Sequence, residues 1–113
     1  MLKIYHNNRC SKSRQALELT RNAGKEVEVI DYLKTPPTAA DLQVILRKLH
    51  MKPDQLIRKN EAIYKDRFKG KNLTDEEWIQ AKVSYPVLIE RPIVVKGEEA
   101  VVGRPPEKVQ ELL

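Results

Sequence analysis

The hydrophobic pattern changes its period twice within the first 32 residues, and this feature constrains the fold of the chain most strongly. Apolar and polar residues alternate over residues 2–5, apolar residues recur at helical spacing over residues 11–23, and alternation returns over residues 26–32. A period of two indicates a strand, whereas a period near 3.6 indicates an amphipathic helix. The pattern therefore predicts a strand–helix–strand unit. We expect its strands to be parallel and its crossover right-handed.

The middle of the chain, from about residue 38 to residue 85, has helical but no strand character. Thr38 precedes Asp41 by three residues, and Thr74 precedes Glu77 by three, which is the spacing of a capping box. We therefore expect helices to begin after both threonines. Between these helices the pattern predicts a short helical piece at 54–59 and then a polar loop that extends to residue 71.

The last part of the chain returns to strand character. Apolar runs at 93–95 and 100–102 flank a turn at 96–99, which predicts an antiparallel hairpin, and residues 107–113 predict a closing helix. The order is β-α-β, a helical block, then β-β-α. This order predicts an α/β fold with a four-stranded mixed sheet of the thioredoxin architecture. We expect a single thioredoxin-like domain over residues 1–113, with a helical insertion at about 38–85 between its two halves.

Cys10 is the only cysteine of the chain, and it lies in the loop between the first strand and the first helix. At a helix N-terminus the backbone N–H groups are unpaired and the helix dipole is positive. Both effects favour a thiolate over a thiol, and the neighbouring cations Arg9 and Lys12 act in the same direction. The sequence therefore predicts a reactive thiolate in an anion-binding loop, with Ser13 and Arg14 as candidates for steadying it.

The charge balance of the chain is mildly basic. Lys and Arg number 21 against 16 Asp and Glu, a formal net charge of +5. The basic residues are spread along the sequence, whereas nucleic-acid-binding chains concentrate them in one block or on one face. The composition therefore disfavours nucleic acid as a partner. It is compatible with small anions such as phosphate, arsenate or glutathione.

Cysteine, histidine and apolar content narrow the class of protein further. One cysteine excludes an intramolecular disulfide framework and is typical of a reducing compartment, so we expect the cytoplasm. His6 and His50 lie far apart in sequence and form no ligand cluster with Cys10, so no metal site is expected. No apolar run approaches the ~18 residues of a membrane span, and no signal peptide is apparent, so no membrane partner is expected.

Five short segments, spread over nearly the whole chain, carry recognisable motifs. They are HNNRCSKSR at 6–14, DYLKTPPT at 31–38, LIRKNE at 56–61, ERPIVV at 90–95 and VGRP at 102–105. Taken together and in this order, they resemble the glutaredoxin-coupled arsenate reductase family. The resemblance is more specific than any one motif because it extends over almost the entire chain.

The resemblance implies a function and a set of site residues. In that family the motif cysteine attacks arsenate, glutathione then releases arsenite, and glutaredoxin resolves the mixed disulfide. By this resemblance Cys10 is the nucleophile and His6 lies near the thiolate. No bound cofactor is implied, because glutathione is a co-substrate. The arginines that hold the oxyanion correspond to Arg58, Arg91 and Arg104.

The physical chemistry of arginine fits this role. A tetrahedral oxyanion needs several fixed donors, and a guanidinium offers a planar, permanently charged fork. Arg91 and Arg104 each precede a proline, which restricts their backbone to extended conformations. Pro92 also occupies the position where thioredoxin-like folds have a cis-proline beside the thiol, so it is a candidate for such a bond.

Two other functions remain open. A monothiol, glutathione-dependent reductase of another substrate is compatible with Cys10 followed by Ser11, Lys12 and Ser13. A non-enzymatic transcription regulator of the same fold fits less well, because such regulators carry Cys-x-x-Cys and Ser13 occupies the second position. Ser13 also excludes a dithiol oxidoreductase of that type. Ala16, in place of an arginine, disfavours the Cys-x5-Arg loop of phosphatase-type enzymes.

Overall fold

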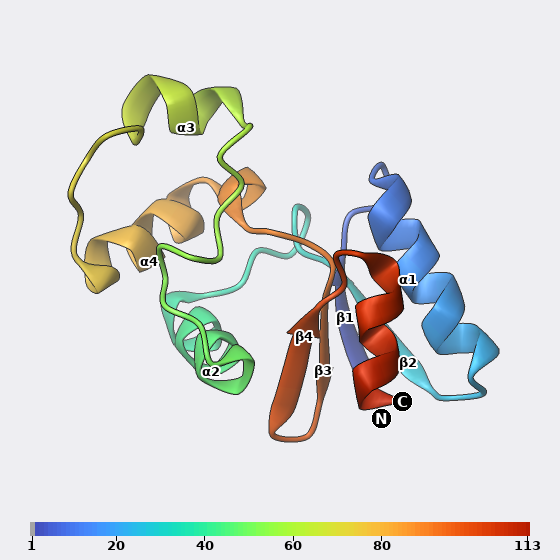
Figure 1. Ribbon diagram of the computed structural model, residues 1–113. Coiled ribbons are helices and arrows are strands. Elements are labelled where there is room, and N and C mark those ends of the chain that lie inside the picture. Colours follow the sequence, from blue (N-terminus) through green and yellow to red (C-terminus); the bar gives the residue numbers. More distant parts are fainter. Residues whose placement is uncertain (1) are drawn as a thin grey trace. The chain divides into compact units, whose positions relative to one another are not determined.

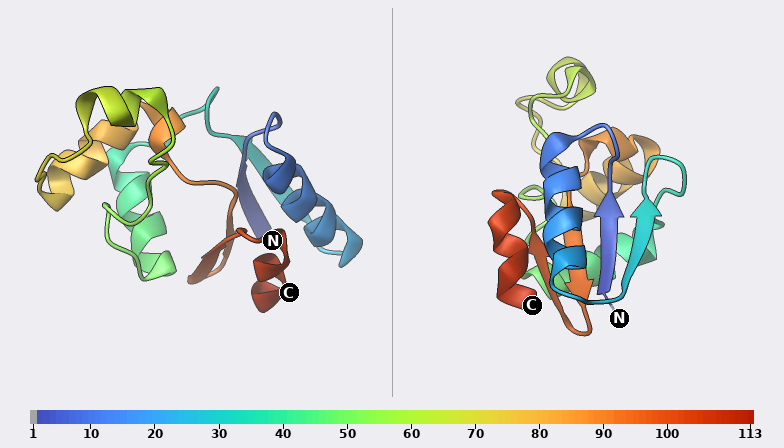
Figure 2. Two further views of the ribbon diagram at one scale, coloured as in Figure 1. Left: turned by 45° about the horizontal axis from the view of Figure 1, so that its top comes forward. Right: turned by 90° about the vertical axis from the view of Figure 1, so that its right-hand side faces the viewer.

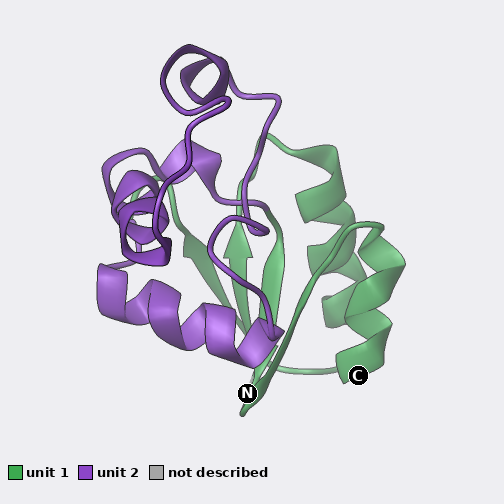
Figure 3. Cartoon of the chain, turned by 60° about the vertical axis from the view of Figure 1, so that its left-hand side comes forward, with its two compact units in different colours: residues 1–35, 91–113 green, residues 36–90 purple. Residues whose placement is uncertain are grey.

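The computed structural model describes residues 2–113, and the chain divides into two compact units (Figure 1). Unit 1 contains residues 1–35 and 91–113, and unit 2 contains residues 36–90 (Figure 3). All strands of the described chain belong to unit 1, whereas unit 2 is helical. Unit 2 is therefore an insertion, in sequence, between the two halves of unit 1.

Unit 1 is built on a four-stranded mixed sheet. Its strands are β1 (Leu2–His6), β2 (Val27–Asp31), β3 (Ile93–Lys96) and β4 (Glu99–Val102). Their order across the sheet is β2-β1-β3-β4. β1 is parallel to β2 and antiparallel to β3, and β3 and β4 form an antiparallel hairpin. The predicted thioredoxin-like α/β fold, β-α-β followed by β-β-α, is confirmed.

One face of this sheet is covered by α1 (Ser11–Asn22) and by the 3₁₀ helix η2 (Pro106–Leu112), which pack against each other (Figure 2). Leu2 and Ile4 of β1 are buried in one apolar cluster with Ala16 of α1. Full burial of an aliphatic side chain stabilises a fold by about 1.5–3 kcal/mol. This cluster therefore anchors α1, and the loop that precedes it, on the sheet.

Unit 2 consists of helices that begin at well-formed caps. Its elements are α2 (Ala39–Leu49), α3 (Ala62–Arg67), α4 (Asp75–Ser84) and the 3₁₀ helix η1 (Pro86–Leu88). Thr38 Oγ1 accepts from the Asp41 N–H at 3.1 Å, and the Asp41 carboxylate accepts from the Thr38 N–H at 3.0 Å. Thr74 and Glu77 form the same pair of bonds at the start of α4. Both predicted capping boxes are confirmed, and an N-cap threonine typically contributes about 1 kcal/mol to helix stability.

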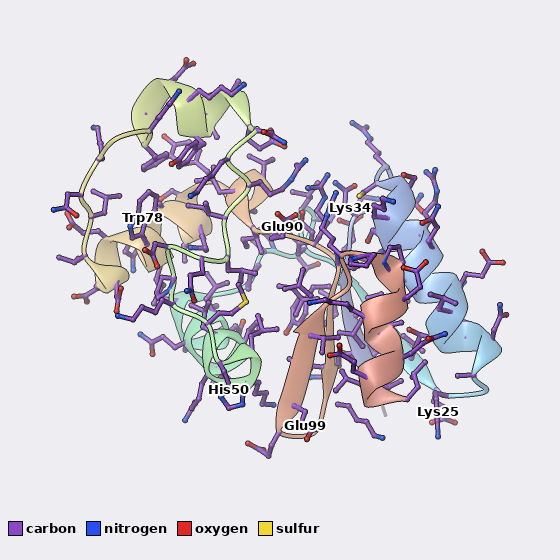
Figure 4. The ribbon with its side chains drawn as sticks, in the orientation of Figure 1. Lys25, Lys34, His50, Trp78, Glu90 and Glu99 are labelled. Atoms are coloured by element: carbon purple, nitrogen blue, oxygen red, sulfur yellow. The ribbon has the colours of Figure 1, made fainter. Side chains whose placement is uncertain are left out.

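The aromatic core of unit 2 gathers around Trp78 of α4, labelled in Figure 4. The centroid of the Trp78 ring lies 6.5 Å from the ring centroid of Tyr64 and 5.9 Å from that of Phe68. Ile57 and Leu88 are buried in the same cluster. Packing of α3 on α4 therefore rests on a few large side chains.

Lys82, on α4, is a fully buried lysine. Its ammonium group donates to the carbonyl of Pro53, and its Nζ lies 5.9 Å from the centroid of the Trp78 ring. Burial removes water from the ammonium group and lowers the pKa of Lys82 to about 8, although the nearby Asp54 carboxylate opposes the shift. The lysine thus connects α4 to the segment after α2 through a polar bond inside an apolar environment.

Two predictions for residues 54–71 were wrong. Residues 54–59 form turns and extended backbone instead of a short helix, and the predicted loop contains α3. Contacts between distant segments explain both differences. The Arg58 N–H donates to the Leu88 carbonyl at 2.8 Å, which takes the place of a helical bond to residue 54. α3 forms where it can place Tyr64 against the ring of Trp78.

The closing helix that the sequence predicts over residues 107–113 is present. It is a 3₁₀ helix that spans Pro106–Leu112. Pro105 and Pro106 stand side by side at its start, and the Lys108 N–H donates to the Pro105 carbonyl at 3.0 Å, an i→i+3 bond. Such tighter turns are common in short terminal segments.

Candidate active site

β1 leads into a tight turn that ends at Cys10, which is 9% exposed. The Cys10 N–H donates to the Asn7 carbonyl at 3.0 Å, and the Cys10 carbonyl accepts from the Arg14 N–H at 3.0 Å. Cys10 is therefore the N-cap residue of α1, with an extended backbone. Its side chain makes no capping hydrogen bond, and the first turn of α1 carries no carboxylate. No anion of that turn therefore competes with the thiol for the positive end of the helix.

His6 and Ser13 form a buried hydrogen bond behind the Cys10 loop. Ser13 Oγ and His6 Nδ1 are 2.6 Å apart, and the two residues are 0% and 4% exposed, respectively. Ser13 Oγ also accepts from the Asn7 N–H at 3.1 Å. A hydroxyl has one proton and two acceptor lone pairs, so Ser13 Oγ can donate to or accept from His6 Nδ1, according to the tautomer of the ring.

Burial keeps His6 in the neutral form. Removal of the ring from water lowers the pKa of His6 below its ordinary value, and the cations Arg21 and Arg14 add to this effect. A side-chain hydrogen bond with Asn8 and the carboxylate of Asp31 act in the opposite direction but are outweighed. His6 therefore interacts with its surroundings as a neutral donor and acceptor, and less as a positive charge.

Arg14 positions the Cys10 loop. Its Nη1 donates to the Asn8 carbonyl at 3.0 Å, across the turn that ends at Cys10. On the same loop, Asn7 Oδ1 accepts from the Arg9 N–H at 3.0 Å. The backbone before the thiol is thus held by two side chains, one from the loop itself and one from α1. In this structure the Arg14 guanidinium binds the backbone of Asn8. Its predicted role in steadying the thiolate stays a prediction.

The sheet register brings Arg91 and Arg104 to the end of β1 that carries the Cys10 loop. Tyr5 pairs with Ile93 at the start of β3, and Ile93 pairs with Val102 at the end of β4. Arg91 precedes β3 and Arg104 follows β4. Both arginines therefore leave the sheet where β1 ends, although they lie far from Cys10 in sequence.

Gly103 ties these two segments to α1. Its N–H donates to the Pro92 carbonyl at 2.8 Å. A Cβ at this position would lie 2.9 Å from Pro92 Cγ and 3.3 Å from Ala16 Cβ, so only glycine allows this close approach. The peptide bonds Arg91–Pro92 and Arg104–Pro105 are both cis. The sequence predicted a candidate cis bond at Pro92, whereas the cis bond before Pro105 was not predicted.

The guanidinium groups of Arg91 and Arg104 are partly or fully enclosed by protein. Arg91 is 7% exposed, and Arg104 is half-buried. Nε and Nη1 of Arg91 and Nη1 of Arg104 are buried and make no hydrogen bond within residues 2–113, although both residues have a further interaction in the chain. Two guanidinium cations thus lie at the end of unit 1 where β1 leads into the Cys10 loop.

Arg58 lies in unit 2, in the turn region after Leu56. Its backbone N–H is bound to the Leu88 carbonyl, and its guanidinium forms an ion pair with the Glu61 carboxylate three residues later. Both side chains are partly buried. The sequence assigned Arg58 to the oxyanion through the family motif, and this role stays a prediction.

A cavity of about 370 Å³ lies beside the Cys10 loop in unit 1. The parallel register explains it, because His6 and Asp31 pair at the ends of β1 and β2 and the turns that follow lie next to each other. Sequence reasoning missed this cavity. The predicted β-α-β unit could have indicated it, since ligands of open α/β sheets bind beyond the carboxyl ends of the strands. Its lining residues are Asn7, Asn8, Arg9, Asp31, Leu33 and Lys34.

Comparison with known proteins places this geometry in a family. The family model described as "ArsC family" matches residues 5–112, nearly the whole chain. The chain belongs to the ArsC family. The resemblance inferred from the five motifs is confirmed, and the thiol-bearing loop of β1–α1 is the first motif of this ArsC-family chain.

Relatives of this ArsC-family chain match it from end to end. An Escherichia coli protein described as uncharacterized, YfgD, is 47% identical, and the match covers 99% of this chain and 96% of that protein. The arsenate reductase of Neisseria meningitidis serogroup A is 40% identical over 99% of this chain and 97% of its own length. A solved structure of an arsenate reductase from Vibrio cholerae is 41% identical, covers 99% of this chain and 97% of that one, and superposes with a TM-score of 0.95.

Among residues 2–113, no group of three or more His, Cys, Asp or Glu side chains is arranged to hold a metal ion. None of the helices in this described part is long and apolar enough to cross a membrane.

Proposed function

We propose that this protein reduces arsenate to arsenite, with the thiolate of Cys10 as the nucleophile. The observation that carries the proposal is the position of Cys10 as N-cap of α1, at the end of the sheet that also carries Arg91 and Arg104, in a chain of the ArsC family. Relatives at 37–40% identity, with matches that cover 97–99% of this chain, are named arsenate reductase. The lone cysteine fits a cycle in which the second thiol comes from another molecule.

The reaction begins with a bond between sulfur and arsenic. The Cys10 thiolate attacks arsenate, and one arsenate oxygen leaves as water after taking up protons from solvent. A glutathione thiolate then forms an S–S bond with Cys10. The S–As bond breaks, its electron pair stays on arsenic, and arsenic(V) leaves as arsenite, arsenic(III). Glutaredoxin then takes the glutathionyl group, which returns Cys10 to its thiolate form.

Arginine holds the oxyanion during these steps. The guanidinium groups of Arg91 and Arg104 provide forked donors for the arsenate oxygens, whose negative charge persists as the S–As bond forms. Donors that are fixed before the reaction stabilise such charge without reorganisation, and the loss of one typically costs about 10²–10³-fold in rate. Gly103 and the register of β3 and β4 support this role, because they fix the backbone positions of Arg91 and Arg104.

His6 supports the thiolate as a neutral group. Its Nδ1 is bound to Ser13, and a side-chain hydrogen bond with Asn8 also engages the ring. Ser13 and Arg14 hold the backbone that precedes the thiol, through Asn7 and Asn8. These three residues therefore act on Cys10 by positioning. The glutathione and glutaredoxin of this cycle belong to the reducing cytoplasm, which is where we place the protein.

The test is a coupled assay with the purified protein. Arsenate-dependent NADPH oxidation is followed in the presence of glutathione, glutaredoxin and glutathione reductase, for the wild type and for Cys10→Ser. We expect turnover that requires all three reductant components and is lost in Cys10→Ser. Absence of arsenate-dependent turnover in the wild type contradicts the proposal. A Cys10–glutathione adduct that forms and turns over without arsenate would indicate a monothiol reductase of another substrate.

A further inference from the structure

The cavity beside the Cys10 loop has the volume of a small-molecule site. It measures about 370 Å³, and ligand pockets typically range from about 300 to 1,000 Å³. The attack of Cys10 on arsenate, as proposed above, uses none of the side chains that line it. The cavity thus lies beside the loop that carries the reactive thiol, and none of the arginines proposed to hold the oxyanion lines it.

Backbone hydrogen bonds fix both walls of the cavity. On one wall, Asn7 Oδ1 accepts from the Arg9 N–H at 3.0 Å. On the other, Asp31 Oδ1 accepts from the Leu33 N–H at 3.2 Å, and the Asp31 carbonyl accepts from the Lys34 N–H at 3.1 Å. The chain segments that carry Arg9 and Lys34 are therefore ordered before any ligand arrives, which reduces the entropy that binding must overcome.

The charges around the cavity are two cations and one carboxylate. Arg9 and Lys34 are exposed at its rim, and Asp31 is half-buried. An inorganic oxyanion would be attracted by the cations but repelled by Asp31, since like charges at close range disfavour each other. A molecule with two carboxylates and one ammonium group matches these charges, because the carboxylates can pair with Arg9 and Lys34 and the ammonium group with Asp31. The amides of Asn7 and Asn8 can pair with peptide groups of such a molecule.

We infer that this cavity binds glutathione, with Arg9 and Lys34 as partners of its two carboxylates and Asp31 as partner of its ammonium group. The inference rests on the proposed function, which names glutathione as the co-substrate. It adds the site that holds this co-substrate beside Cys10. Arg9 is bonded directly to Cys10, and consecutive Cα atoms lie about 3.8 Å apart, so a tripeptide held against Arg9 lies within its own length of the Cys10 thiol.

Binding is tested with S-methylglutathione, which keeps every charge of glutathione but cannot react with Cys10. Its dissociation constant is measured by calorimetry for the wild type, Lys34→Glu and Lys25→Glu. Lys25 is the matched control, because it is an exposed lysine of the same unit that lies before β2, at the other end of that strand from Lys34 (Figure 4). We expect Lys34→Glu to raise the dissociation constant at least about fivefold, and Lys25→Glu to leave it within about twofold.

Each other outcome of this experiment overturns the inference. Equal dissociation constants for the two variants would show that the effect is one of net charge only. A wild type that does not bind S-methylglutathione at millimolar concentration would show that the cavity is not its site. Displacement of S-methylglutathione by an equal concentration of inorganic phosphate would show that the cavity selects oxyanions instead.

Steady-state kinetics separates this inference from the proposed function. If the protein reduces arsenate, Lys34→Glu should raise the KM for glutathione by a similar factor and leave the KM for arsenate unchanged. Unchanged glutathione kinetics with normal arsenate turnover would contradict the inference alone. If arsenate is not reduced but S-methylglutathione binds with the expected pattern of variants, the cavity assignment stands while the arsenate proposal fails.

Discussion

Ser13 Oγ lies 2.6 Å from His6 Nδ1, and both side chains are buried beneath the loop that carries Cys10. This hydroxyl accepts a hydrogen bond from the Asn7 backbone N–H and forms a second one with the imidazole. The position corresponds to the second cysteine of a Cys-x-x-Cys motif. Here it holds a residue that orients the histidine and the backbone before the nucleophile.

Replacement of Ser13 by alanine is expected to affect both stability and the titration of His6. It leaves a buried imidazole nitrogen and the Asn7 N–H without this partner, which costs about 1–3 kcal/mol of unfolding free energy. Loss of the hydroxyl should shift the pKa of His6, upward where Oγ donates to Nδ1 and downward where Nδ1–H donates to Oγ, so the sign of the shift identifies the donor. Urea denaturation and an NMR titration of His6 measure the two effects. Ser11→Ala, at an exposed position of the same helical turn, is the control, and a His6 pKa equal in both variants would contradict a hydrogen bond between Ser13 and the ring.

Replacement of Cys10 by serine is expected to remove activity without loss of stability. Serine is a good N-cap residue and its volume is close to that of cysteine, so the unfolding free energy should remain equal or increase by up to about 1 kcal/mol. Arsenite formation should fall by at least about 10³-fold, because the nucleophile is absent. Thermal unfolding measured beside the coupled assay checks both statements. Retained turnover in the folded variant would mean that the nucleophile lies elsewhere.

Replacement of Arg91 by lysine is expected to impair arsenate turnover although the charge is kept. Lysine cannot reproduce the planar fork, so kcat/KM for arsenate should fall by about tenfold or more. The same change at Arg21, an exposed residue in the last turn of α1, is the matched control and should have little effect. Kinetic constants of Arg91→Lys that equal those of the control would argue against contact between Arg91 and the oxyanion.

Buried Lys82 is expected to make stability depend on pH in the alkaline range. Its pKa is about 8 in the folded protein and 10.5 in an exposed lysine, so the unfolded chain binds more protons between these values and stability rises with pH there. From pH 7 to pH 10 this single group should contribute a gain of about 2–3 kcal/mol.

A comparison of variants isolates this contribution. Lys82→Met removes the titrating group, so the difference in unfolding free energy between wild type and variant should change by that amount across the range. Lys65→Met, at an exposed position of α3, should leave the pH dependence of the wild type in place. Parallel stability curves for the wild type and Lys82→Met would show that Lys82 stays charged when buried.

Local patterns were sufficient for much of the fold. The alternation in residues 2–5 and 26–32, the capping spacings that begin at Thr38 and Thr74, and the turn at Gly97 each act within a few residues, and each prediction from them agrees with the structure. The five motifs, taken together and in order, were sufficient to identify the family. Short-range preferences of this kind are properties of the sequence itself.

Tertiary contacts decided the features that local patterns missed. α3 forms inside a polar segment because Tyr64 reaches Trp78 of another helix, and residues 54–59 remain irregular because the Arg58 backbone bonds to a distant carbonyl. The cavity that Lys34 lines exists only because the ends of β1 and β2 are in register.

The same division holds at the candidate site. From the sequence alone, Cys10 could be predicted as a thiol at a helix N-terminus, because strand, loop and helix follow one another directly along the chain. Only the tertiary structure decided that Ser13 binds His6 and that Arg91 and Arg104 reach the same end of the sheet as Cys10. The physical reason is that β1 pairs with β3 through contacts between residues about ninety positions apart, which no local propensity encodes.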